Sequence, residues 1–124
     1  MPNTHYTEDH EWVRLDADGT ATVGITDHAQ DALGDIVFIE LPPVGKTFAK
    51  GDTLAVVESV KAAADVKMPV AGKVLAVNDA LPGDPAVVNT DPLGTGWFVR
   101  MEPQAPADLD QLMDEAAYKA LIGS

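Results

Sequence analysis

Short hydrophobic segments alternate with turn-forming residues along most of the chain. Segments rich in Val, Ile, Leu and Phe are separated by 10 glycines and 9 prolines, which are spread through the sequence. Closely spaced short strands of this kind are typical of a compact antiparallel sandwich or barrel. The first predicted hairpin joins residues 12–15 to 20–25 through Asp16-Ala17-Asp18-Gly19, and a further strand is predicted over 36–41, before Pro42-Pro43.

Two segments depart from the strand pattern. In residues 26–34, Thr26 can cap a helix and Gly34 can end it, so we expect one short helix of about two turns. After Pro106, apolar residues follow helical spacing, and Asp108 with Gln111 matches a capping box. We expect a C-terminal helical segment over about 107–122 whose apolar face packs against the sheets. Leu109, Leu112, Met113 and Ala116 form this face, and Tyr118 and Leu121 either extend it or belong to a second short turn.

Residues 44–58 and 71–89 contain a weak internal repeat. Gly45-Lys46 is followed by Gly51-Asp52 and an apolar run, and Gly72-Lys73 is followed by Gly83-Asp84 and the run Ala-Val-Val-Asn. Two similar units of strand, turn and strand predict a sandwich with pseudo-two-fold symmetry. This interpretation makes residues 86–89 a strand.

Composition and charge narrow the class of protein. A chain of 124 residues is long enough for one domain. With 8 Lys and Arg against 20 Asp and Glu, the formal net charge is −12, which argues against nucleic acid and anionic membranes as partners. No apolar run approaches the ~20 residues that span a bilayer, and no signal peptide is visible.

Catalytic and metal-binding chemistry finds little support in the sequence. The chain has no cysteine, which excludes disulfides, thiolate catalysis and Cys-ligated metals. The three histidines, His5, His10 and His28, do not form a metal-binding helical motif, so no metal site is predicted. The isolated glycines do not form a phosphate-binding loop. The sequence therefore contains no recognisable catalytic motif of these kinds.

The most informative segment surrounds Lys61. Two β-capable runs, 54–58 and 63–70, flank a short turn that lacks Gly, so a primed hairpin turn is disfavoured and a type I turn is tolerated. Lys61 then stands at the exposed tip among small or aliphatic residues such as Val60 and Ala62. The turn either carries an ordinary surface lysine or displays a lysine for covalent modification, with small neighbours that let an enzyme reach it.

This segment resembles the lipoyl-attachment motif of the glycine cleavage system H protein family. The resemblance rests on Glu-Ser-Val-Lys-Ala-Ala over 58–63, followed by Asp65-Val66 and by Pro-Val-Ala-Gly over 69–72. Further blocks agree in family order: residues 11–13, residues 24–30 with 33–38, and residues 89–97. The match covers almost the whole chain, from about residue 10 to residue 121. Biotin carriers and the lipoyl domains of 2-oxoacid dehydrogenases have different residues beside the lysine.

The resemblance implies a mainly β fold, the barrel-sandwich hybrid of lipoyl and biotinyl domains. It implies one domain over 1–124, with a core of about 10–103, a short helix in the N-terminal half and a C-terminal helical segment. Lipoic acid would be attached covalently to Lys61, and Glu58, Ser59, Val60 and Ala62 would let the attaching enzyme recognise the hairpin. Lysine plus lipoyl reaches roughly 14 Å, far enough to enter another protein's active site.

The resemblance also implies that the protein is not an enzyme but a non-catalytic carrier with several partners. These are glycine decarboxylase (P protein), aminomethyltransferase (T protein), dihydrolipoyl dehydrogenase (L protein), and a lipoate ligase or lipoyl/octanoyl transferase. The carrier takes the aminomethyl group of glycine from the first enzyme to the second and is reoxidised by the third. We expect a monomer of the bacterial cytoplasm, or of the mitochondrial matrix if the chain is a processed eukaryotic form.

Two residues are candidates for holding the loaded arm. A protonated amine in a partly desolvated groove favours a nearby carboxylate. Asp65 follows Lys61 on the returning strand, and Glu11 stands beside Trp12 in a block that the resemblance places near the arm. Each could instead be a solvated surface acid. Two other functions also remain open at this point: a relay protein that passes lipoate to other enzymes, and an interaction module with an unmodified lysine.

Overall fold

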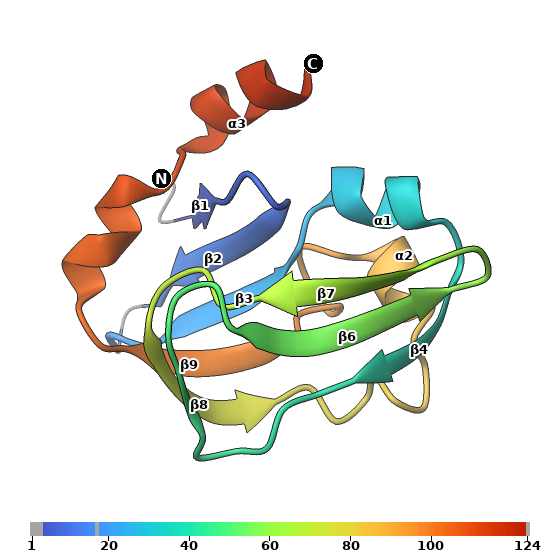
Figure 1. Ribbon diagram of the computed structural model, residues 1–124, viewed down its shortest axis with the longest axis horizontal. Helices are drawn as coiled ribbons and strands as arrows, with labels where there is room; N and C mark the ends of the chain where they lie inside the picture. The colour runs from blue at the N-terminus through green and yellow to red at the C-terminus, as the bar shows by residue number, and fades with distance from the viewer. Residues whose placement is uncertain (1–3, 17, 124) are drawn as a thin grey trace.

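Two antiparallel sheets and three short α-helices make up the computed structural model, which describes residues 4–16 and 18–123 (Figure 1). The larger sheet has the order β1-β2-β3-β9-β8-β5 and the smaller sheet has the order β4-β6-β7. The strands are β1 (Thr4–Tyr6), β2 (Glu11–Leu15), β3 (Ala21–Ile25), β4 (Ile36–Glu40), β5 (Thr47–Phe48), β6 (Thr53–Ser59), β7 (Ala63–Lys67), β8 (Gly72–Val77) and β9 (Val99–Pro103). The predicted mainly β, two-sheet fold is confirmed.

The core lies between the two sheets. Val13, Val23 and Met101 of the larger sheet are fully buried, as are Ile39 and Val57 of the smaller sheet. Alternate residues of β9 turn inward, as the period of two in a strand requires. The two sheets therefore enclose one hydrophobic core, whose burial is the main favourable contribution to folding.

The short helix predicted in the N-terminal half is confirmed as α1 (Asp27–Leu33). The Thr26 hydroxyl accepts a hydrogen bond from the Ala29 amide, and the helix ends at Gly34, which has a φ of 81°. A positive φ favours glycine because it has no Cβ. Both ends of α1 are thus determined by local sequence.

The predicted repeat fails in its second copy. Val87–Thr90 forms the short helix α2 instead of a strand. Pro85 lies just before this helix, and the Val88 amide donates to its carbonyl oxygen at 3.1 Å. Hydrogen bonds between residues three apart occupy the backbone groups that a strand would need. Val88 of α2 is buried in the core, and Val87 packs against it partly buried.

The predicted capping box of the C-terminal segment is wrong. Residues Pro106–Gln111 form a 3₁₀-helix without a side-chain cap, and Asp108 lies inside it. The segment is interrupted because Met113 forms a bridge with Tyr6 of β1, which requires extended backbone there. The helix α3 (Glu115–Ile122) then begins after Asp114, whose carboxylate accepts a hydrogen bond from the Ala117 amide at 2.8 Å.

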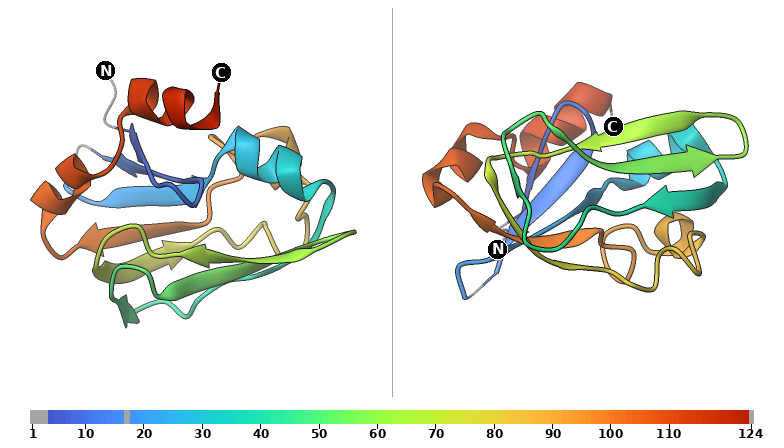
Figure 2. Two further views of the ribbon diagram at one scale, coloured as in Figure 1. Left: turned by 45° about the horizontal axis from the view of Figure 1, so that its top comes forward. Right: turned by 60° about the horizontal axis from the view of Figure 1, so that its bottom comes forward.

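Helix α3 packs beside β1 at the edge of the larger sheet (Figure 2). Tyr118 is buried, as predicted for the apolar face of this segment, and its ring stacks on Tyr6 at 4.7 Å. Its hydroxyl lies 2.7 Å from the Thr26 hydroxyl and 2.8 Å from Nδ1 of His10. One buried tyrosine thus joins the C-terminal helix to β1 and to the start of α1. No helix of the described residues is long and apolar enough to cross a membrane.

Ala17, within the predicted linker of the first hairpin, lies outside the described residues, as do residues 1–3 and 124. The strands on either side of this linker pair as predicted, with Leu15 opposite Ala21. Strand β1 was not predicted. It adds to the larger sheet ahead of β2, with Tyr6 opposite Trp12.

Candidate functional site: an exposed lysine on a two-residue turn

Lys61 stands in the tight turn that joins β6 to β7. The Ser59 amide donates to the Ala62 carbonyl oxygen at 2.7 Å, which closes a turn with only Val60 and Lys61 at its centre. The Ser59 hydroxyl oxygen accepts hydrogen bonds from the amides of Lys61, at 3.2 Å, and Ala62, at 3.0 Å. Ser59 therefore stabilises the turn through backbone groups and leaves the Lys61 side chain uninvolved.

The backbone of this turn agrees with the sequence prediction. Among the described residues, His10 is the only non-glycine residue with a positive φ. Type I′ and II′ turns need a positive φ at one or both central positions. Val60 and Lys61 therefore do not form a primed turn, as predicted from the absence of Gly.

Residues distant in sequence hold the turn from behind. The Val60 amide donates to the Asp35 carbonyl oxygen at 3.0 Å. Asn89 supports that segment, because its Oδ1 accepts from the Ile36 amide at 2.9 Å and its Nδ2 donates to the Gly34 carbonyl oxygen at 2.9 Å. The turn thus lies against the connection between α1 and β4, as Figure 1 shows.

The Lys61 side chain is exposed and extends past Gly34. A Cβ added at Gly34 would lie 3.5 Å from Cε of Lys61. Within residues 4–16 and 18–123, no carboxylate lies within salt-bridge distance of Lys61. An exposed primary amine on a well-held turn is accessible to an enzyme that acylates it.

The other predicted recognition residues lie on the same hairpin. Val60 is 69% exposed at the tip, and Ala62 is exposed beside it. Glu58 is exposed at the end of β6, opposite Phe38 of β4 and Ala63 of β7. Together with Ser59, these residues surround the lysine.

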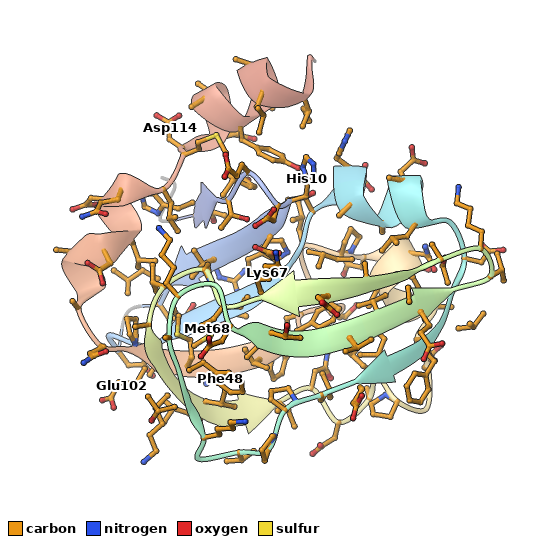
Figure 3. All side chains as sticks on the ribbon, in the orientation of Figure 1. His10, Phe48, Lys67, Met68, Glu102 and Asp114 are labelled. Carbon is orange, nitrogen blue, oxygen red and sulfur yellow. The ribbon has the colours of Figure 1, made fainter. Side chains whose placement is uncertain are left out.

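Glu11 lies elsewhere, and it is not a surface acid. It is buried on β2, and its carboxylate accepts hydrogen bonds from the Thr7 hydroxyl at 2.7 Å and the Lys67 amide at 3.2 Å. Burial raises the pKa of Glu11, while these two hydrogen bonds act in the opposite direction. Figure 3 shows Lys67 on β7, at the end away from the turn.

A cleft of about 300 Å³ opens beside Glu11. Its lining combines charged, aromatic and apolar side chains, among them Tyr6, Lys50, Lys67, Met68 and Met113. Lys61 is not part of this lining. The structure therefore does not bring Lys61 and Glu11 into contact.

Asp65 lies between them, exposed in the middle of β7. At about 3.3 Å per residue, its Cα is about 13 Å along the strand from that of Lys61, and the Cα of Lys67 is about 20 Å away. Because β7 is an edge strand, it has one side free of β-pairing, and the Lys67 amide that binds Glu11 points to that side. The three predicted residues thus follow one another along β7 and its open edge.

Sequence reasoning missed the supports of the turn. Asn89 belongs to one of the blocks that carried the resemblance, yet its separation from Gly34 and Ile36 in sequence gave no indication of contact. The Ser59 hydroxyl was detectable, since serine side chains commonly bond backbone groups two or three residues ahead in turns.

A two-sheet β domain with an exposed lysine on a tight hairpin has the fold of the lipoyl carrier proteins. The sequence model of the family described as "Glycine cleavage H-protein" matches residues 4–124. Two bacterial relatives carry the name glycine cleavage system H protein. That of Chromobacterium violaceum is 59% identical over 119 residues, covering 96% of this chain and 93% of the relative. That of Rhodospirillum rubrum is 54% identical over 123 residues, covering 99% and 98%.

A solved structure agrees with these matches. The crystal structure of a glycine cleavage system H protein from Mycobacterium marinum superposes with a TM-score of 0.91 at 38% identity, covering 100% of this chain and 99% of that one. The chain belongs to the glycine cleavage H-protein family, and it is a carrier protein of the glycine cleavage system.

Proposed function

We propose that Lys61 carries lipoic acid as an amide on Nζ, and that the chain is a non-catalytic carrier acting as one domain over 1–124. The observation that supports this most directly is the exposed Lys61 side chain on a turn whose hydrogen bonds involve only backbone groups and Ser59. Val60 and Ala62 are exposed on either side, so the residues present fit a group attached at the tip. When bound, the lipoyl group supplies a dithiolane sulfur that takes up the aminomethyl group of glycine.

The proposed partners are the enzymes that attach, load, unload and reoxidise such an arm. Glycine decarboxylase (P protein) loads the arm, aminomethyltransferase (T protein) unloads it, and dihydrolipoyl dehydrogenase (L protein) reoxidises it. Because the chain has no cysteine, it has no thiol redox chemistry of its own. A lipoate ligase or a lipoyl/octanoyl transferase attaches the group. We place this monomeric carrier in the bacterial cytoplasm.

The open edge of β7 would hold the loaded arm. An arm of roughly 14 Å that folded back from Lys61 would bring its end beside Asp65, about 13 Å along the strand. Glu11 lies beyond Asp65, beside Lys67 at about 20 Å along the strand, which exceeds this reach. Asp65 would therefore pair with the ammonium group of the arm, whereas Glu11, buried and bonded to Thr7 and Lys67, would act only through its charge from the neighbouring cleft. Sheltering this group from water slows the loss of ammonia and formaldehyde.

Intact mass and peptide mapping test the attachment. The chain isolated from its own cell gains the mass of one lipoyl group, and the modified peptide contains Lys61. Lipoate on Lys67 or Lys73 instead would refute the assignment. Reconstituted exchange of glycine with bicarbonate by the decarboxylase then tests the carrier activity.

The decay rate of the loaded arm tests the docking residues separately. Asp65→Asn speeds decay more than Glu11→Gln, because Asp65 lies closer to the end of the arm. Equal decay in the wild type, both variants and a denatured sample would show that neither carboxylate shelters the arm.

A further inference from the structure

Exposed apolar side chains gather on the strand next to the lysine turn. Val37 and Phe38 of β4 are 54% and 49% exposed, although they are neighbours in one strand. The register between β4 and β6 shifts between Ile36 and Phe38, so this irregularity replaces the usual alternation. Bulges of this kind re-aim side chains and are common beside functional sites. Here the shift turns two successive large apolar residues toward water.

These residues are continuous with the turn itself. Phe38 lies opposite Glu58 in the sheet, and Glu58 precedes Lys61 by three residues. The Val60 amide is bonded to the Asp35 carbonyl, two residues before Val37. Val60, also exposed, lies in the turn beside Lys61, and we refer to Val37, Phe38 and Val60 together as the apolar patch.

Carboxylates surround this patch on the outer face of the smaller sheet. The register places Glu58 beside Phe38, and it places Glu40 in line with Asp65 across β6. All three acids are exposed, and among the described residues none of them forms a salt bridge. A complementary surface would present an apolar pocket edged by Lys or Arg, because opposite potentials favour encounter and fix orientation.

The length of the unmodified Lys61 side chain indicates which partner contacts the outer face of the smaller sheet. Before modification, Nζ lies only about 6 Å from Cα by ordinary bond lengths, so an enzyme that acylates it must lie directly against the turn. Enzymes that use the finished arm act roughly 14 Å away and can remain farther off. A standard interface covers about 800 Å² on each partner, and an interface of that size centred on Lys61 extends over β4.

We propose that Val37, Phe38 and Val60 form the apolar centre of the docking surface for the enzyme that acylates Lys61, with Glu40, Glu58 and Asp65 as its acidic rim. This rests on the proposed function. The acyl donor is an acyl adenylate or an acyl thioester held by that enzyme. Nζ of Lys61 forms an amide bond with the acyl carbonyl carbon, the bond from that carbon to phosphate oxygen or sulfur breaks, and a base of the enzyme takes the Nζ proton.

The test measures lipoylation of the unmodified chain by a lipoate ligase with lipoate and ATP, followed by intact mass. Phe38→Ser lowers kcat/KM for the chain by about tenfold or more, mainly through KM, because a central aromatic anchor carries much of an interface's affinity. Val37→Ser is a second variant with a smaller effect in the same direction. Leu75→Ser is the matched control, since Leu75 is 40% exposed on β8 of the other sheet, and it changes kcat/KM by less than about twofold. Circular dichroism confirms that each variant is folded.

The outcomes separate this proposal from the proposed function. If the wild type is not lipoylated at Lys61, the proposed function fails. If the wild type is lipoylated and Phe38→Ser and Val37→Ser match Leu75→Ser, the docking surface is refuted and the function stands. Normal lipoylation of Phe38→Ser with weakened glycine–bicarbonate exchange would likewise overturn the proposal, because it would assign the patch to the decarboxylase.

Discussion

The turn between β2 and β3 and the turn between β6 and β7 use their side chains in opposite ways. In the first, Gly19 has a φ of 88°, and its amide donates to the Asp16 carbonyl oxygen at 3.1 Å. The Asp18 carboxylate accepts hydrogen bonds from both the amide and the hydroxyl of Thr20, at 3.0 and 2.6 Å. The polar side chains of this turn stabilise the turn itself.

The charges around the first turn are also paired. Arg14 lies 3.4 Å from Asp16, and Arg100 of β9 lies 3.8 Å from Asp16 and 3.3 Å from Asp18. The Thr22 hydroxyl donates to Asp16 as well. Every one of these charged groups therefore has a partner within the same surface.

The second turn obtains its stability without using its lysine. Ser59 bonds backbone groups only, and the remaining support comes from the Asp35 carbonyl and, behind it, from Asn89. This contrast distinguishes a structural turn from one that presents a group for chemistry. An unpaired lysine alone would be an ordinary surface residue, whereas an unpaired lysine on a turn held from behind has a defined position.

The largest expected effect is loss of modification in Lys61→Arg. A guanidinium stays protonated and does not form the lipoyl amide, so lipoylation and glycine–bicarbonate exchange are abolished. The free energy of unfolding changes by no more than about 0.5 kcal/mol, since the side chain is exposed. Arg14→Lys in the other turn is the control and keeps full lipoylation. Intact mass and urea unfolding measure the two effects, and exchange activity in Lys61→Arg would contradict the assignment.

Asn89→Ala tests the support behind the lysine turn. It leaves the Ile36 amide and the Gly34 carbonyl without their partner, which costs about 2 kcal/mol of unfolding free energy. Hydrogen exchange at the Val60 amide accelerates, because its acceptor Asp35 lies between those residues. Thr90→Ala, next along α2, is the control and changes stability by less than about 0.5 kcal/mol. Unchanged exchange at Val60 in Asn89→Ala would mean that the turn does not depend on this support.

Asn89 also shows where sequence reasoning ends. Helix α1 was predictable because its cap, Thr26, and its stop, Gly34, are local signals. The position of the lysine turn was predictable because it lies between two apolar runs, and its non-primed backbone was predictable because the turn itself contains no glycine. The contacts of Asn89 with Gly34 and Ile36 depend on how distant segments meet, and no spacing in one sequence encodes that.

In the C-terminal segment, a local sequence signal was present but a long-range contact overrode it. Asp108 and Gln111 match a capping box locally, yet Met113 pairs with Tyr6 of β1 and interrupts the helix. A tertiary bridge overrides the local preference. Glu11 is a similar case: its charge favoured an exposed or partly exposed position, but the hydroxyl of Thr7 and the amide of Lys67 satisfy it in a buried one.

Ser59→Ala has a smaller effect, on both stability and modification. Loss of the hydroxyl leaves the amides of Lys61 and Ala62 to water and costs about 1 kcal/mol. The loosened turn also raises the KM for lipoylation. Asp18→Ala, which removes the equivalent side-chain contacts of the other turn, destabilises the protein without changing lipoylation. A rise in KM for Asp18→Ala as well would show that lipoylation responds to general loss of stability and not to this turn.

The smallest expected effect is a difference in pH dependence: the first turn contributes a stability that depends on pH, and the second does not. Hydrogen bonds from the hydroxyl and the amide of Thr20 hold the pKa of Asp18 below its ordinary value of 3.8, with Arg100 acting in the same direction. An acid whose pKa is lowered on folding contributes stability above its unfolded pKa and loses it as the pH falls through the folded value. The difference in unfolding free energy between the wild type and Asp18→Asn therefore shrinks as the pH falls from about 4 toward 2.

The difference between the wild type and Ser59→Ala stays constant over the same range, because the hydroxyl does not titrate. Urea unfolding at a series of pH values measures both, and parallel slopes for the two variants would contradict the assignment of charge-dependent stability to the first turn alone.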